Sequence, residues 1–157
     1  MIEEGGFGPI IQMDVSRSVV ENMRLRCDSF VSNGSMKVVL DDATELSAFR
    51  DGMIDACIDK GLLDAIFCAS NADDDFDQLH QIITSVSRVL RPNGSFLFFS
   101  LSRPEFLLPA LLGTASSKWR NIQVQQLPKI ILYIIQKTDD SVFHIKRNSG
   151  KRKIRRR

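Results

Sequence analysis

Three aspartates in the first 60 residues stand at the ends of short apolar runs, Asp14, Asp42 and Asp59. Runs of this kind predict buried strands, and open α/β sheets bind their ligands where parallel strands end. A carboxylate there can accept hydrogen bonds from ribose hydroxyls or from the amino group of an adenine ring. The pattern therefore indicates a polar ligand site along one edge of a sheet.

Each aspartate also has a purely structural interpretation. Asp14 precedes Ser16, a good helix N-cap residue, so its charge could serve only the helix dipole. Asp42 and its neighbour Asp41 could form a solvated turn. Asp59, Lys60 and Gly61 could form an ordinary turn between a strand and a helix. Residue types and spacing leave both interpretations open.

The elements that would position these residues alternate between strand and helix. Strands are predicted at 10–13, 36–40, 54–58, 95–101, 121–127 and 129–137, and helices at 16–27, 79–90 and 104–113. A short amphipathic piece is expected around Leu46 and Phe49, and the RPNG sequence at 91–94 is expected to end a helix. The alternation predicts one doubly wound α/β domain over residues 1–138, with an antiparallel pair at its end.

The composition is that of a globular domain: 43% of the 157 residues are hydrophobic and 25% are charged. No apolar run approaches the roughly 20 residues of a membrane-spanning helix, so no membrane partner is expected. The amino terminus lacks a secretory signal pattern, and the three cysteines have no metal-ligand spacing. These features favour a reducing, cytoplasmic compartment.

The carboxyl terminus differs in charge from the rest of the chain. Eight of the 21 Lys and Arg residues fall in the last 14 positions, leaving 13 against 17 acids in residues 1–138. Residues 139–157 are therefore expected to be a basic tail outside the packed core. Such a tail could be a nuclear address or could bind a polyanion such as nucleic acid.

Several segments resemble one family, the class I S-adenosylmethionine-dependent methyltransferases. Within it, the sequence is similar to a group whose members methylate lysines or the amino terminus of elongation factor 1-alpha, or methylate citrate synthase. The segments that carry the resemblance are MDVSRSVVENM, LDDAT, IDKGLLDA and VSRVLRPNGSFLFFSLSRPEFL. The resemblance implies a Rossmann-like sheet with helices on both faces, S-adenosylmethionine as the cofactor, and a protein substrate such as an elongation factor or another lysine-bearing protein.

The resemblance also assigns roles to residues. Asp14 and Val15 match positions that contact the ribose, and Asp42 with Ala43 match positions that contact the adenine. Asp59 and Gly61, from the Asp-Lys-Gly signature, are assigned to cofactor binding, and Asp59 is also the candidate catalytic residue. No general base is expected, because a neutral lysine needs alignment with the methyl group more than proton transfer.

One part of the family pattern has no match. The family's first strand and its glycine-rich loop should precede Met1, so the chain is expected to be an N-terminally truncated form. Gly5, Gly6 and Gly8 stand before the strand that ends at Asp14, and a turn is the simpler interpretation of these glycines.

Three functions from different classes follow. The first is a protein methyltransferase, the second is a non-catalytic remnant of the fold that binds a partner, and the third is a nucleic-acid-associated protein led by the basic tail. Other candidate residues favour structural roles: His80, His144, Cys57, Cys68 and the acidic run 73–77.

Overall fold

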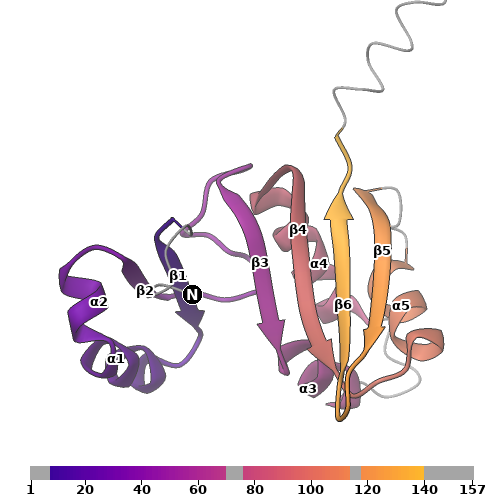
Figure 1. The fold of residues 1–157 in the computed structure, drawn as a ribbon, viewed down its shortest axis with the longest axis horizontal. Helices are drawn as coiled ribbons and strands as arrows, with labels where there is room; N and C mark the ends of the chain where they lie inside the picture. The colour runs from indigo at the N-terminus through magenta and orange to yellow at the C-terminus, as the bar shows by residue number, and fades with distance from the viewer. Residues whose placement is uncertain (1–7, 70–75, 114–117, 140–157) are drawn as a thin grey trace, which may run out of the picture. The chain divides into compact units, whose positions relative to one another are not determined.

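The structure, a computed structural model, describes residues 8–69, 76–113 and 118–139. The chain divides into two compact units, residues 1–50 and 51–157. The first unit contains β1 (Ile10–Asp14), α1 (Arg17–Arg26), α2 (Asp28–Ser32) and β2 (Met36–Leu40). The second contains β3 (Ile54–Lys60), α3 (Leu62–Ala69), α4 (Asp77–Val89), β4 (Leu90–Ser100), α5 (Pro104–Leu112), β5 (Trp119–Gln126) and β6 (Ile131–Lys137) (Figure 1).

The first unit is a single strand-helix-strand crossover. β1 and β2 pair in parallel from Ile10 opposite Met36 to Asp14 opposite Leu40, as the apolar runs predict. Val20 of α1 and Val38 of β2 are buried, and the Arg24 guanidinium donates to the Val38 carbonyl at 3.0 Å. Both strands therefore end at the same edge of their sheet.

The second unit is built on a four-stranded sheet in the order β3-β4-β6-β5. β3 and β4 are parallel, and β6 is antiparallel to both of its neighbours, β4 and β5. The predicted antiparallel pair at the end of the fold is thus confirmed. The helical period of α4 also holds, because Leu79, Ile82, Ile83 and Val86 are all buried.

Helices α3, α4 and α5 lie on one face of this sheet, behind the strands in Figure 1. Both crossovers, from β3 to β4 and from β4 to β5, step across the sheet in the same direction. When two right-handed connections step across a sheet in the same direction, their helices lie on the same face of that sheet. On that face Phe98 and Tyr133 are fully buried and their rings stack 4.7 Å apart.

Within the described part of the second unit, the helices cover one face of the sheet. On the opposite face, Ile58 pairs with Leu97 and Leu97 with Ile134, while Phe99 pairs with Leu132. These five apolar side chains are partly or largely exposed, with Ile58 at 55%. The continuous apolar runs of β4 and β6 are therefore buried on alternate residues only.

Several element boundaries differ from the sequence-based prediction, and the differences at β3 and β4 follow from their pairing. β3 continues through Asp59 and Lys60, because these residues pair in register with Phe98 and Phe99 of β4. The RPNG sequence does end α4, but it lies within the span of β4 as an irregularity. The register there passes from Ile54 opposite Leu90 to Ala56 opposite Ser95.

Some predictions fall outside the described residues: those for Gly5 and Gly6, for residues 73–75 of the acidic run, for His144 and for the tail beyond Asp139. Among the helices that the structure describes, none combines the length and apolar character needed to cross a membrane.

Candidate functional site

Asp14 ends β1 and turns its carboxylate toward the start of α1. Its Oδ1 accepts the backbone N–H of Ser16 at 2.8 Å, and Ser16 is the N-cap residue of the helix, as predicted. Oδ2 has no hydrogen-bond donor within the described ranges. The structural and the ligand-binding interpretations are therefore compatible, because one oxygen supports the turn and the other remains an acceptor.

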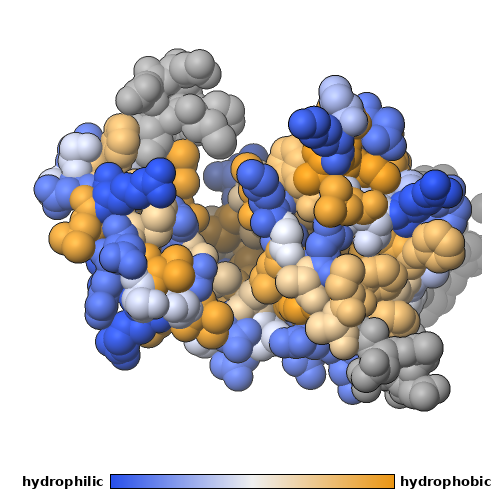
Figure 2. All heavy atoms as spheres, turned by 90° about the horizontal axis from the view of Figure 1, so that it is seen from below, coloured by the Kyte–Doolittle hydropathy of each residue, from blue (hydrophilic) through white to orange (hydrophobic). Residues whose placement is uncertain are grey.

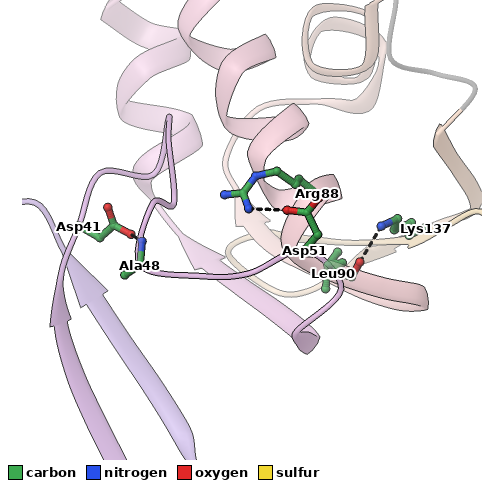
Figure 3. Close-up of polar contacts among 6 residues, drawn as sticks. All are labelled: Asp41, Ala48, Asp51, Arg88, Leu90 and Lys137. Carbon is green, nitrogen blue, oxygen red and sulfur yellow. Dashed lines mark hydrogen bonds and ion pairs between the residues drawn. The ribbon is translucent and has the colours of Figure 1, made fainter.

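The two neighbouring aspartates after β2 have different surroundings. Asp41 uses both oxygens to close the loop that follows: Oδ1 accepts from Asp42 N and Ser47 Oγ, and Oδ2 accepts from Ala48 N at 2.9 Å (Figure 3). Burial raises the pKa of Asp41, but these hydrogen bonds outweigh it, so the pKa lies below its ordinary value. Asp41 is thus a structural residue of the loop.

Asp42 is exposed, and its carboxylate accepts fewer hydrogen bonds than that of Asp41. Its Oδ1 accepts both the backbone N–H and the hydroxyl of Thr44, at 2.8 and 2.7 Å, and these bonds lower its pKa. No donor in the described part of the chain reaches Oδ2. Because the Asp41 amide donates to the Asp14 carbonyl at 3.2 Å, Asp14 and Asp42 follow adjacent strand ends. Val15, 69% exposed, and the partly exposed Ala43 stand beside them.

Asp59 and Gly61 belong to the second unit, where they form the junction between β3 and α3. The Asp59 carboxylate accepts the N–H groups of Leu62 at 3.1 Å and Leu63 at 3.2 Å, so it caps the helix. Gly61 has φ +100°, and a Cβ there would meet nothing within 4 Å. Glycine is therefore required for the backbone angle and not for space.

The pKa of Asp59 lies above its ordinary value. Burial is the largest cause, the hydrogen bonds from Leu63 and Leu62 oppose it, and the negative charge of Asp64 adds to it. The sequence signature is thus a helix cap whose carboxylate is held in a partly buried, negative environment. A capping role does not exclude contact with a ligand, so the assignment of Asp59 to cofactor binding and catalysis stays a prediction.

Sequence reasoning missed Asp64, the second acid of IDKGLLDA. Its Oδ1 accepts the Ser100 hydroxyl and its Oδ2 accepts the Leu101 N–H at 2.8 Å, so it ties α3 to the end of β4. The Tyr133 hydroxyl then donates to the Ser102 carbonyl at 2.7 Å, and burial with the nearby charges of Glu105 and Asp64 raises its pKa to about 12. The turn after β4 is therefore held by hydrogen bonds to α3 and to β6.

Ion pairs in the second unit occur at the opposite end of the sheet. Arg88 pairs with Asp51 at 2.9 Å (Figure 3), and Arg91 pairs with Asp55 at 2.6 Å, both near the start of β3. Near its end, no Lys or Arg in the described ranges lies within ion-pair distance of Asp59, Asp64 or Glu105. Figure 2 looks onto this end, where apolar residues gather among the polar ones. The acids at the end where β3 and β4 finish are therefore without ion-pair partners among the described residues.

The other candidates have structural explanations. Burial raises the pKa of the Cys57 thiol to about 12, so it is protonated at neutral pH and is no nucleophile. Lys137 donates from Nζ to the Leu90 carbonyl at 2.7 Å (Figure 3) and fastens β6 to the start of β4. Cys68 is exposed on α3.

Solved structures with a similar fold define the class of protein. A S-adenosylmethionine-dependent methyltransferase from Methanosarcina mazei matches with a TM-score of 0.61 at 15% identity, over 83% of this chain and 82% of that one. A methyltransferase from Streptococcus mutans in complex with SAH matches with a TM-score of 0.55 at 14% identity, over 82% and 76%. The fold is that of the class I, Rossmann-like methyltransferases.

Sequence comparison gives the family. Residues 2–98 match the family described as methyltransferase domain, and the chain belongs to that family. The cofactor that this membership implies is S-adenosylmethionine, and the implied enzyme class is methyltransferase.

Two curated relatives are EEF1A lysine methyltransferases. EEF1A lysine methyltransferase 2 of Danio rerio is 33% identical over 98 residues, which are 60% of this chain and 39% of the relative. EEF1A lysine methyltransferase 4 of Bos taurus is 29% identical over 107 residues, 65% of this chain and 40% of the relative. The chain thus spans about two fifths of the length of these relatives.

Proposed function

We propose that the protein transfers a methyl group from S-adenosylmethionine to a lysine side chain or the amino terminus of another protein. The observation that carries the proposal is the pair Asp14 and Asp42, which follow adjacent parallel strands and each keep a carboxylate oxygen without a donor among the described residues. The family membership and the names of the relatives support it.

The residues of the first unit fit the cofactor. Asp14 would accept from the ribose hydroxyls, and Asp42 would accept from the adenine amino group. Val15, with 69% of its surface exposed, and Leu40, with 40%, offer apolar contact area beside these acids. The bound cofactor would supply an electrophilic methyl group on a sulfonium.

Acidic residues of the second unit fit a lysine-bearing substrate. Asp59, Asp64 and Glu105 have no ion-pair partner within the described ranges, so their charges would attract a protonated lysine toward the end where β3 and β4 finish. Transfer then requires the amine in its neutral form, aligned with the methyl group and shielded from water. No described side chain is assigned the role of a general base.

Titration of S-adenosylmethionine into the purified protein tests the proposal. Asp14→Ala should weaken binding by about 1 to 3 kcal/mol, the usual cost of removing an acceptor from buried donors. Asp28→Ala is the matched control, since this exposed carboxylate touches only Ser32 within its own helix. Equal affinity for the wild type and Asp14→Ala would remove Asp14 from the site.

We also propose that the active form carries a further strand and a glycine-rich loop before Met1. Among the described strands, β1 pairs only with β2 and β3 only with β4, which leaves one side of each strand available for pairing. Titrating the cofactor into this chain and into any longer product of the same gene compares the two forms. Equal affinity would count against the need for the loop.

The second candidate function is an interaction module without catalysis. It is favoured by the helix-capping role of Asp59, which occupies both carboxylate oxygens. An elongation factor, another lysine-bearing protein, or nucleic acid held by the basic tail are the partners proposed, with nuclear delivery as a further proposed role of the tail. Methylation of candidate substrates with radiolabelled cofactor separates catalysis from binding alone.

A further inference from the structure

The second unit contains a concave site of its own. It is a pocket of about 450 Å³ bounded by α3, the start of α4, and α5. Its lining residues are Phe67, Phe76, His80, Glu105, Phe106, Pro109, Ala110 and Gly113. The volume lies within the range of pockets that hold small ligands, about 300–1,000 Å³, so it has room for one large side chain.

Three phenylalanine rings contribute to its walls. The rings of Phe67 and Phe76 stack with centroids 5.8 Å apart and planes at 19°. Phe76 has φ +49°, a left-handed backbone conformation that is rare for a bulky residue and tends to occur at functional sites. Phe106 is 65% exposed on α5. These rings present apolar faces with negative electrostatic potential, which attract cations.

Two polar groups in the lining lack partners. Glu105 is the only carboxylate among the lining residues, and no Lys or Arg of the described ranges lies within ion-pair distance of it. His80 follows Phe76 by one turn, with its N–H donating to the Phe76 carbonyl at 2.9 Å. The His80 Nε2 is buried without a hydrogen-bond partner within the described part of the chain.

Gly113 makes room for this histidine. A Cβ at position 113 would stand 2.6 Å from His80 Nε2, closer than side chains tolerate. The glycine that ends α5 therefore allows the imidazole to keep its place in the pocket wall. Among the described residues, the lining is therefore mainly apolar, with the imidazole of His80 in its wall and the Glu105 carboxylate as its negative charge.

We infer that this pocket binds an arginine side chain of a protein partner, at a docking position separate from the residue that receives the methyl group. An arginine has an apolar stem for the Phe rings, a planar cation that is attracted to them, and N–H donors for the exposed Glu105 carboxylate. Lysine fits less well, because its ammonium is a strongly hydrated point charge. The inference rests on the proposed function in one respect, namely that the protein engages another polypeptide.

Nuclear magnetic resonance of the whole 157-residue chain tests this inference with Nα-acetyl-arginine methylamide as the probe. The citrulline analogue has nearly the same shape without the charge, and the norleucine analogue keeps only the apolar stem. The arginine probe should produce saturable shifts at the His80 ring and the Phe106 amide. The neutral probes should bind about fivefold to tenfold more weakly.

Variants distinguish the charge from the aromatic surface. Glu105→Gln and Phe106→Leu should each weaken the arginine probe by about fivefold to tenfold, because the first removes the charge and the second removes a ring while retaining apolar area. Glu21→Gln and Leu25→Ala are the matched controls, because both residues are exposed on α1, and they should leave binding unchanged.

Equal binding of arginine and citrulline, or unchanged binding by Glu105→Gln, overturns the inference. It is also overturned if replacing the six Lys and Arg residues of 151–157 by glutamine tightens probe binding, since the occupant would then be the chain's own tail. The measurement needs neither cofactor nor methyl transfer. Absence of methyl transfer would therefore not contradict arginine binding in the pocket, and absence of arginine binding would not contradict methyl transfer.

Discussion

Asp42 and Asp59 both stand at the end of a strand, but their surroundings shift their pKa values in opposite directions. Hydrogen bonds from Thr44 lower the pKa of Asp42. Burial raises the pKa of Asp59, and the bonds from Leu63 and Leu62 only partly offset it. The charged form of Asp42 therefore stabilises the fold, whereas the charged form of Asp59 destabilises it.

This difference predicts opposite pH dependence for two matched variants. A raised pKa gives Asp59 a stabilising contribution below its ordinary pKa that is lost as the pH rises through the raised value. A lowered pKa gives Asp42 a contribution that is present above its ordinary pKa and is lost as the pH falls through the lowered value. Relative to wild type, Asp59→Asn should therefore gain thermal stability, and Asp42→Asn should lose it, as the pH rises from about 3 to 7.

Thermal denaturation followed by circular dichroism across this pH range checks both slopes with the same protein preparations. Parallel slopes for the two variants would contradict the assignment.

Methyl transfer by Asp59→Asn adds the functional test. A variant with normal turnover would leave Asp59 as a helix cap alone, whereas lost turnover in a folded protein would support its catalytic assignment.

Among the elements, α3 depends on a contact that is distant in the sequence. Asp64 of α3 accepts from Ser100 and Leu101 at the end of β4, 36 and 37 residues away. Removing the carboxylate leaves the buried Ser100 hydroxyl without this acceptor, whereas the exposed Leu101 N–H can bond to water. The cost of an unsatisfied buried group is about 1 to 3 kcal/mol. Asp64→Ala should lower the free energy of unfolding by that amount.

Chemical denaturation of Asp64→Ala beside Asp55→Ala measures this contribution. Asp55 belongs to the same unit, but its ion pair with Arg91 is exposed, and such pairs contribute about 0 to 1 kcal/mol. Similar losses for the two variants would show that Asp64 contributes no more than a surface charge does.

The same elements show how far the sequence could predict this structure. β1 and β2 are predictable because Ile10 to Met13 and MKVVL are bounded by polar and turn residues, and α4 because its apolar residues keep a helical period. The extra residues of β3, Asp59 and Lys60, are strand only because β4 pairs with them. Asp64 could not be found from local patterns, since Ser100 comes close only in the folded chain.

The candidate site follows the same rule. Asp14 and Asp42 were predictable because a strand followed by an acid is a local pattern. Loop geometry decides which carboxylate oxygens accept hydrogen bonds from the described residues. It leaves one oxygen of Asp14 and one of Asp42 without such a donor, and it gives the Asp41 carboxylate donors from Ser47 and Ala48. The pocket around Phe76 was not predicted, because it depends on how α3, α4 and α5 pack together.

Across the whole molecule, the two units differ in the size of their cores. Of the buried hydrophobic residues that the structure describes, three belong to the first unit (Val20, Val38 and Leu46) and 17 to the second. A two-stranded sheet with one main helix is close to the limit of independent stability. The first unit, which carries Asp14 and Asp42, should therefore open more readily than the second.

Native-state hydrogen exchange of the whole chain tests this difference. The amide of Asp41, which bonds to the Asp14 carbonyl, should exchange at least about tenfold faster than the amide of Phe98, which lies in β4 between two paired strands. If the first unit binds the cofactor, S-adenosylmethionine at about one hundred times its dissociation constant should slow the Asp41 amide about a hundredfold, because a ligand stabilises the state that binds it. At the same cofactor concentration, Asp14→Ala should reduce that protection by at least about fivefold, the weakest loss of affinity expected for this variant, and leave Phe98 unchanged. Protection confined to β4 and β6 would instead place the ligand on the second unit, and the roles of Asp14 and Asp42 would have to be abandoned.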